Sequence, residues 1–276
     1  MSRKGENMAA GIFERYDAKV KEILAFERKG KKKNGPPKTL AIVYSENKNR
    51  TVFDGRSVVR SLYDEMADKG WTKKEGKNWH WREDANVRIP ESGKEVRLER
   101  IVAESRDKRQ MEWTWQMSTS SGIEEREPGD KLNAANKRRS VDLVRAHGDN
   151  RYSFVELKVE ADNPLYALFE ILGYALAYLH ARSGGRTGTG IHNVMQAKHI
   201  RLVVLGPECW YRYNKDDPSS PKFELQWMAD ELTKGLKDLS KSKPEFSIAF
   251  EEFGDHESLE EAAADIIGLA NKLLMK

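Results

Sequence analysis

The chain has 276 residues, of which 38% are hydrophobic and 33% charged, a composition that supports a buried core and excludes a disordered tail. No apolar run reaches the roughly 18 residues of a membrane span, and the first residues lack the apolar segment of a secretory signal. With Cys209 as its one cysteine, the chain can form neither a disulfide framework nor a cysteine-rich zinc cluster. We therefore expect a protein of the reducing cytoplasm, with no membrane partner.

The net charge of +4 is unevenly distributed along the sequence. Residues 1–90 contain 21 Lys and Arg against 13 Asp and Glu, a net charge of +8, whereas residues 91–276 carry a net charge of −4. A basic segment is typical of proteins that bind a polyanion, although a solvated basic surface has the same composition. We predict a basic N-terminal region over 1–90 that contacts nucleic acid through Lys31, Lys32 and Lys33, followed by a domain over 91–276.

Hydrophobic periodicity and turn residues predict alternating helices and strands. Within the N-terminal region we expect helices over 8–28 and 58–69, a strand over 39–44 and a hairpin over 70–81. The second domain is expected to contain, in order, helix 94–105, strands 111–117, 140–145 and 152–159, helix 164–182, strand 200–205, helix 223–239, strand 246–253 and helix 258–274. Strands mixed with helices in this way favour an α/β fold.

The most informative segment is the predicted hairpin over 140–159. If its turn is formed by residues 148–150, the pairing register places Asp142 directly opposite Glu156, with the Cβ atoms about 5 Å apart. Lys158 lies two residues further on and therefore shares the face of Glu156. The residues of this strand that point to the opposite face are apolar: Val155, Leu157 and Val159.

Two carboxylates that face each other repel, and a cation between them removes the repulsion. Oxygen ligands in a small cluster suit Mg²⁺ or Mn²⁺. Lys158, beside such an ion, could orient or deprotonate an attacking water, or stabilise the charge of a transition state. The residues Asp142, Glu156 and Lys158 also fit an exposed salt-bridge face of a hairpin, and spacing alone does not separate the two interpretations.

Asp142, the hairpin, Glu156-Leu157-Lys158 and the long helix after them resemble the PD-(D/E)XK nuclease superfamily, which has the restriction-endonuclease-like fold. The family order of helix, three strands, helix and strand matches the order predicted over 94–205, so the resemblance covers roughly 110 of the 276 residues. Val141 stands where the family name has proline, a position that varies in the family. The resemblance implies a mixed central sheet flanked by helices, and Mg²⁺ or Mn²⁺ as cofactor. It does not reach residues 1–90, which we expect to form an additional N-terminal α+β region.

Members of the family often add an acidic residue from the helix before the sheet, and Glu99 is our choice for this third metal ligand, with Glu95 second. In the long helix after the hairpin, Glu170-Ile-Leu-Gly-Tyr174 resembles the Gln-x-x-x-Tyr of some RecB-like members, with Glu in place of Gln. The resemblance implies that Glu170 binds metal through water or orients Lys158, and that Tyr174 touches phosphate. Solvated helix acids and core-edge tyrosines are the alternatives.

The expected function is a metal-dependent nuclease that hydrolyses phosphodiester bonds in DNA, with RNA not excluded as a substrate. Arg138 and Arg139, directly before the first hairpin strand, are further expected phosphate contacts. The alternative is a nucleic-acid-binding or interaction module that has the same fold and no catalysis. The sequence leaves open the strand type, the sequence preference, endonuclease versus exonuclease action, and whether the protein forms a homo-oligomer or joins a larger complex.

Overall fold

The computed structural model describes residues 12–26, 53–67, 79–82, 88–104, 112–119, 139–159, 164–185, 191–241 and 243–273. The predicted strand over 39–44 and most of the predicted hairpin over 70–81 lie outside these residues. Within the described part, no helix is both long enough and apolar enough to cross a membrane.

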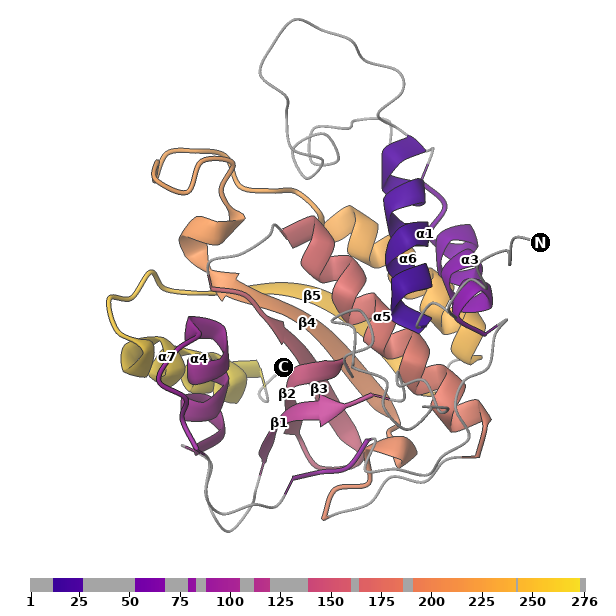
Figure 1. Ribbon diagram of the computed structural model, residues 1–276, viewed down its shortest axis with the longest axis horizontal. Coiled ribbons are helices and arrows are strands. Elements are labelled where there is room, and N and C mark those ends of the chain that lie inside the picture. The colour runs from indigo at the N-terminus through magenta and orange to yellow at the C-terminus, as the bar shows by residue number, and fades with distance from the viewer. Residues whose placement is uncertain are drawn as a thin grey trace, which may run out of the picture.

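A five-stranded mixed sheet forms the centre of the protein, with its strands in sequence order (Figure 1). The strands are β1 (Trp113–Ser118), β2 (Ser140–Ala146), β3 (Arg151–Leu157), β4 (His199–Pro207) and β5 (Glu245–Phe253). The first three strands pair antiparallel, and β3, β4 and β5 pair in parallel. Each parallel pair needs a crossover connection, and these contain α5 (Pro164–Ser183) and α6 (Gln226–Ser240).

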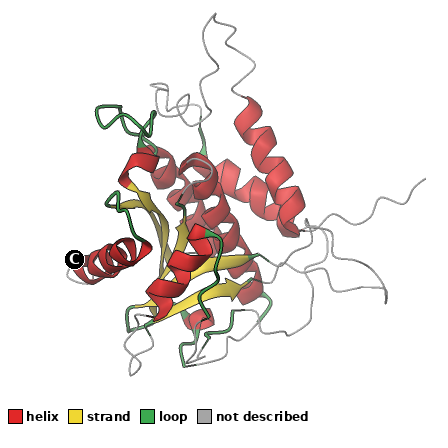
Figure 2. Ribbon diagram, turned by 60° about the vertical axis from the view of Figure 1, so that its left-hand side comes forward, coloured by secondary structure: helices red, strands yellow, loops and turns green. Residues whose placement is uncertain are grey.

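Helices cover both faces of the sheet (Figure 2). On one face α5 and α6 pack together with α1 (Ile12–Phe26) and α3 (Gly55–Ala67), and on the other α4 (Lys94–Glu104) packs against α7 (Leu259–Leu273). Two short 3-10 helices, η4 (Val194–Gln196) and η5 (Glu208–Tyr211), flank β4. The chain is therefore an α/β protein with a helix–sheet–helix arrangement.

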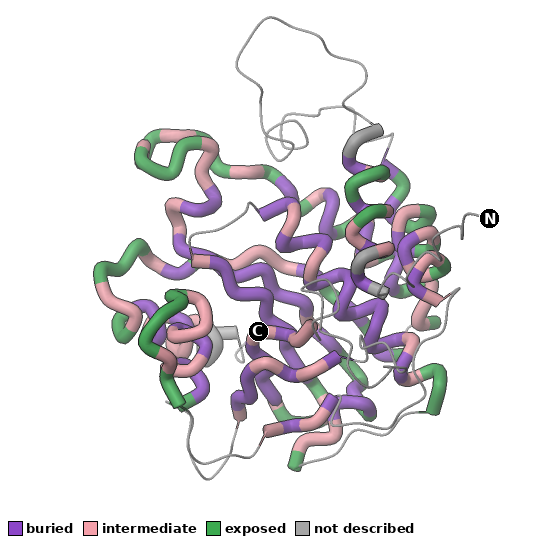
Figure 3. The backbone as a smooth tube through the Cα atoms, in the orientation of Figure 1, coloured by how far each residue is buried: buried purple, intermediate pink, exposed green. Residues whose placement is uncertain are grey.

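The two hydrophobic clusters follow the two faces of the sheet. The larger one joins α5 to the described residues of the N-terminal region, including Tyr16, Leu62 and Trp79, so this region shares the core of the sheet domain. In Figure 3 the buried backbone runs along the strands and α5. Two glycines bring α3 and α6 together, because a Cβ atom on Gly235 would lie 2.6 Å from the carbonyl oxygen of Gly55.

The predicted helices and strands that fall on described residues are present with shifted ends, except that residues 79–81 of the predicted hairpin are not in a strand. The largest shifts are at the starts of α3, which begins at Gly55, and α6, which begins at Gln226 because the backbone N–H of Phe223 instead donates to the carbonyl oxygen of Tyr211 at 2.8 Å. The strand β3 ends at Leu157, so that Lys158 is the first residue after it.

Candidate functional site

The predicted register of the β2–β3 hairpin is confirmed. Leu143 pairs with Val155 and Val144 with Phe154, and one further step in the same register sets Asp142 opposite Glu156. The turn has three consecutive residues with positive φ: Gly148, Asp149 and Asn150. Val155 and Leu157 are buried on the opposite face, as predicted, against α4 and α7.

Backbone pairing between β1 and β2 is interrupted where Asp142 lies. Trp115 pairs with Leu143 and Met117 with Val141, but no pair joins Gln116 to Asp142. Gln116 has φ of +43°, a conformation that is uncommon for residues other than glycine. The register is unchanged on either side, so the irregularity is a local kink without an inserted residue. Sparsely populated backbone conformations of this kind cluster at functional sites.

The side chain of Asp142, at this irregularity, contacts the neighbouring strand β3 of the hairpin. One of its carboxylate oxygens, Oδ2, accepts a hydrogen bond from the backbone N–H of Leu157 at 2.9 Å. This bond connects Asp142 to the peptide unit between Glu156 and Leu157. Asp142 and Glu156 are therefore held side by side by backbone geometry.

Lys158 lies between two carboxylates. Its Nζ atom is 2.5 Å from Oε1 of Glu156 and 3.2 Å from Oε2 of Glu170, and its side chain is only 10% exposed. Burial by itself would lower the pKa of Lys158, but the charges of Glu156 and Glu170 outweigh burial and raise this pKa well above its ordinary value. Lys158 is therefore a protonated hydrogen-bond donor at neutral pH.

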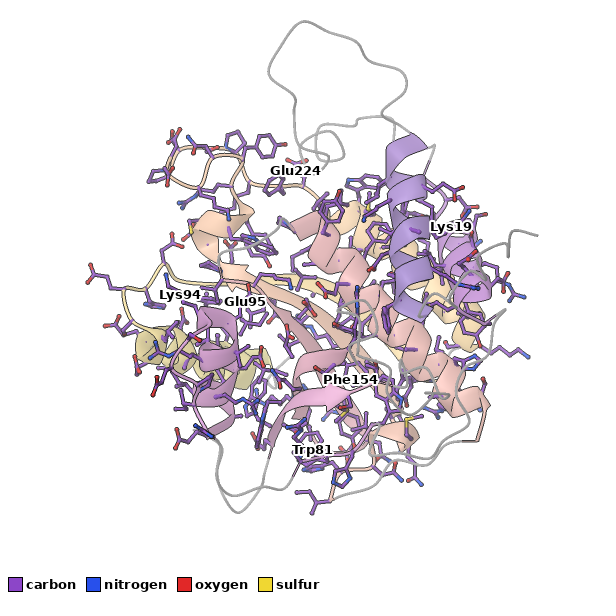
Figure 4. The ribbon with its side chains drawn as sticks, viewed as in Figure 1. Lys19, Trp81, Lys94, Glu95, Phe154 and Glu224 are labelled. Atoms are coloured by element: carbon purple, nitrogen blue, oxygen red, sulfur yellow. The ribbon has the colours of Figure 1, made fainter. Side chains whose placement is uncertain are left out.

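The helix acid predicted as a third ligand is Glu99 of α4, and its side chain is buried (3% exposed). Burial, and next the charge of Asp142, raise the pKa of Glu99 to about 9. Glu95, one turn earlier, has its Oε1 atom 3.4 Å from the backbone nitrogen of Val159. Figure 4 marks Glu95 at the start of α4, on the side nearest the strands. Both acids predicted on this helix thus face the hairpin.

The carboxylates of the site lack the donors that buried oxygens normally have. Oε2 of Glu99 and Oε2 of Glu156 are buried and accept no hydrogen bond within the described part of the chain. Burial raises the pKa of Asp142 to about 7, and burial together with the charge of Asp142 raises the pKa of Glu156 well above its ordinary value. Buried carboxyl groups of this kind stay ionised only beside a positive charge, and otherwise they keep a proton.

The donor set fits a hard divalent cation. Glu99, Asp142 and Glu156 supply carboxylate oxygens, which are the ligands of Mg²⁺ and Mn²⁺, and two of these oxygens are unpaired. In the described residues, no group of three His, Cys, Asp or Glu side chains is already arranged around one point at which a metal could be held. One reason is that Lys158 takes up Oε1 of Glu156.

Glu170 lies beside the hairpin acids, as predicted, and forms part of a second chain of contacts. Its Oε2 atom pairs with Lys158, and its Oε1 atom is 3.4 Å from the hydroxyl of Tyr174 and 3.8 Å from Nη1 of Arg139. Tyr174 is buried behind Glu170, with only 3% of its surface exposed. Arg139 also pairs with Asp17 of α1 and lies over the ring of Phe13.

The expected nucleic-acid contacts are only partly located. Lys31, Lys32, Lys33 and Arg138 lie outside the described residues. Arg139 is described, and its guanidinium is engaged by the carboxylates of Asp17 and Glu170. A phosphate contact by Arg139 stays a prediction, and would require the guanidinium to be shared with these acids.

Two residues near the site were not selected from the sequence as members of it. Asp17 reaches it through Arg139, a contact across 122 positions that no local pattern signals. Gln116 lies on β1, which was predicted from its tryptophans. Its left-handed backbone, its side-chain hydrogen bond with Glu99 and its contact with Arg100, Oε1 to Nη2 at 3.1 Å, show that it belongs to the site.

No protein-family model, curated protein or solved structure matches this chain. The site therefore has to be interpreted from its own geometry and chemistry.

Proposed function

We propose that the protein is a Mg²⁺- or Mn²⁺-dependent nuclease that hydrolyses phosphodiester bonds in DNA. The single observation that carries this proposal is the pair of unpaired, buried carboxylate oxygens on Glu99 and Glu156, on either side of Asp142 and next to Lys158. A purely structural salt-bridge face normally pairs its buried carboxylate oxygens, because unpaired buried charge is destabilising.

The order of elements supports the finer assignment to the restriction-endonuclease-like fold. From α4, through the antiparallel strands β1, β2 and β3, to α5 and β4, the chain has the helix, three strands, helix and strand of the PD-(D/E)XK family. Asp142 and Glu156-Leu157-Lys158 lie on the second and third strands of this order and at the start of the connection that follows.

The residues have separate roles in this proposal. Glu99, Asp142 and Glu156 would hold the cation, which when bound makes its water more acidic and offsets charge on a phosphoryl oxygen. Lys158 is the cationic donor nearest these acids, so it stabilises the negative charge that develops on the phosphate. Glu170 holds the ammonium group of Lys158 in position when Glu156 turns toward a cation.

A binding module without catalysis is the second candidate, favoured by the same Lys158–Glu156 pair. If this pair is permanent, Lys158 itself balances the charge of Glu156 and no cation is required. The two candidates differ in whether Lys158 releases Glu156 when divalent cations are added.

The deciding experiment incubates the purified protein with single- and double-stranded DNA, with Mg²⁺, with Mn²⁺ and with chelator. We expect cleavage with either cation and none with chelator, because the carboxylates repel each other without one. RNA of the same sequence measures substrate class in parallel. A protein that is inert on every substrate with both metals, yet binds DNA, would establish the second candidate.

Glu170→Gln tests the positioning of Lys158. The substitution removes a charge that holds the ammonium group, and changes of this kind around a metal site reduce metal affinity or activity roughly 10- to 100-fold. A metal titration measures the affinity, and the rate at saturating metal measures the activity. The control is Glu22→Gln on α1, which breaks the exposed Lys19–Glu22 pair and should change neither quantity. A Glu170→Gln enzyme with unchanged metal affinity and unchanged rate would remove this role.

A further inference from the structure

A concave feature lined by aromatic rings lies at the same end of the sheet as the carboxylate site. It is a pocket of about 420 Å³ between η5, the start of α5 and the start of α6. This volume is within the range of small-molecule binding sites, about 300–1,000 Å³. The aromatic residues that line it are Tyr211, Phe223, Trp227 and Phe250.

The rings of the pocket are held in place from behind. The hydroxyl of Tyr211 bonds to the backbone carbonyl oxygens of Val204 and Glu251, at 2.7 and 2.8 Å. Trp227 packs edge-to-face against Phe53 with ring centroids 5.6 Å apart, and Phe223 lies 5.0 Å from the ring of Tyr213. Rings that are already ordered lose little conformational entropy when a flat ligand stacks on them.

The sheet connects this pocket to the carboxylate site. In the parallel register Glu156 pairs with Val204, and Val204 pairs with Phe250, so the three lie in one row across neighbouring strands. Two strand spacings, roughly 10 Å, separate Glu156 from Phe250 along this row. Pro164, the first residue of α5, also lines the pocket, and the same helix carries Glu170 of the site. A ligand that occupies both places must therefore bridge only a short distance.

The polar groups of the pocket select against phosphate. Its lining includes the carboxylates of Glu224 and Asp230, and the described lining residues include no Lys or Arg. Glu224 is marked near the top of Figure 4 and directly precedes the residues that begin α6. Gln226 donates to Oδ1 of Asp230 at 2.9 Å and so orients that carboxylate. Carboxylates repel a phosphate but accept hydrogen bonds from the amino group of a base such as cytosine.

We propose that this pocket binds one unpaired nucleobase of the strand whose phosphodiester lies at Asp142 and Glu156. This inference rests on the proposed nuclease function, and it makes the preferred substrate a single strand or a duplex with an unpaired base. A base stacked and paired within a duplex cannot present its face to the rings. A base that carries an amino group is favoured over thymine, because thymine offers no amino donor to Glu224 and Asp230.

The test measures binding, so that it is independent of cleavage. Single-stranded oligonucleotides, each with one abasic position, are titrated into wild-type protein in chelator and into the Asp142→Asn protein with Mg²⁺. We expect one abasic position to weaken binding by roughly 5- to 150-fold, the effect of losing one stacked base. In the Phe223→Ala protein that same abasic position should have a smaller effect, because one of the four stacking rings is already absent.

Two further variants make the result specific. Phe223→Leu keeps an apolar side chain if Phe223→Ala proves unstable, and the abasic scan on wild-type protein requires no variant at this position. Tyr63→Ala on α3 is the matched control, a half-buried aromatic residue outside the pocket, and it should keep the full abasic effect. Uniform abasic effects in the wild type, an abasic effect that is undiminished in Phe223→Ala, or no binding of single strands in either condition would overturn the proposal.

The proposed base pocket and the proposed nuclease activity can be refuted separately. A protein that cleaves DNA but shows no sensitive abasic position refutes the pocket alone. A protein that never cleaves but shows the position-specific effect refutes the nuclease and retains the base site. If tetramethylammonium displaces the oligonucleotide at constant ionic strength, the aromatic and acidic residues of the pocket bind an organic cation and not a base.

Discussion

Cleavage of DNA should be lost in the Asp142→Asn, Glu156→Gln and Lys158→Ala proteins. The first two substitutions each remove a charged oxygen from a site whose buried carboxylates need a cation, and the third removes the donor nearest to them. Loss of one such stabilising group reduces kcat by roughly 100- to 1,000-fold. Initial rates with Mg²⁺ and with Mn²⁺ on the same DNA measure this effect.

Matched substitutions away from the site show whether the losses are specific. Asp64→Asn removes an aspartate that pairs with Arg60 on α3, Glu104→Gln an exposed acid at the end of α4, and Lys234→Ala a lysine that pairs with Glu231. All three should cleave at the wild-type rate. Full activity in Asp142→Asn would contradict the proposed metal site. A large decrease in Tm in all three site variants would show that the substitutions act on folding.

Without divalent cations, the stability of the protein should decrease as the pH rises, and Glu99→Gln should remove much of this decrease. Burial raises the pKa of Glu99 from 4.5 to about 9 on folding, and burial raises that of Asp142 from 3.8 to about 7. Between the unfolded pKa values near 4 and the folded pKa of about 9, the folded state therefore binds more protons than the unfolded state. Linkage then requires the free energy of unfolding to fall as the pH rises through this range.

Glu99→Gln isolates one of these groups. Above pH 4.5 the carboxyl of Glu99 must take up a proton on folding, so its replacement by a neutral amide should gain roughly 1–4 kcal/mol at pH 8, and each kcal/mol corresponds to about 2–4 °C in Tm for a chain of this size class. The gain should be mostly lost near pH 4.5, where the carboxyl is protonated in the folded state and half protonated in the unfolded state. His147, whose pKa burial lowers to about 4, has the opposite effect but only below pH 6.5.

Metal should reduce the difference in stability between the two proteins. Mg²⁺ or Mn²⁺ at 100 times its dissociation constant adds about 2.7 kcal/mol to the stability of a protein that binds it. Wild-type protein should gain this stability at pH 8, and Glu99→Gln should gain less. Glu104→Gln serves as the control and should follow the wild type throughout. Equal pH dependence in wild type and Glu99→Gln would show that folding does not raise the pKa of Glu99.

Local patterns in the sequence predicted most of the described secondary structure and the centre of the candidate site. Apolar residues at helical spacing predicted the helix over 164–182, and Gly148-Asp149-Asn150 predicted the turn that sets the β2–β3 register. Because side chains alternate along a strand, this register by itself put Asp142 opposite Glu156 and buried Val155 and Leu157 behind them. These features depend on neighbours in sequence or on a single short turn.

The remaining features depend on packing between distant segments. The sequence could not separate Glu99 from a solvated helix acid, because its burial depends on how α4 lies against the sheet. The Arg139–Asp17 pair joins α1 to the residue before β2, and the aromatic pocket gathers rings from η5, the loop before α6, α6 and β5. Electrostatic interactions and ring stacking act over a few ångströms in space whatever the separation in sequence. For this reason the sequence determined the carboxylate pair, and only the tertiary structure decided which charges and rings surround it.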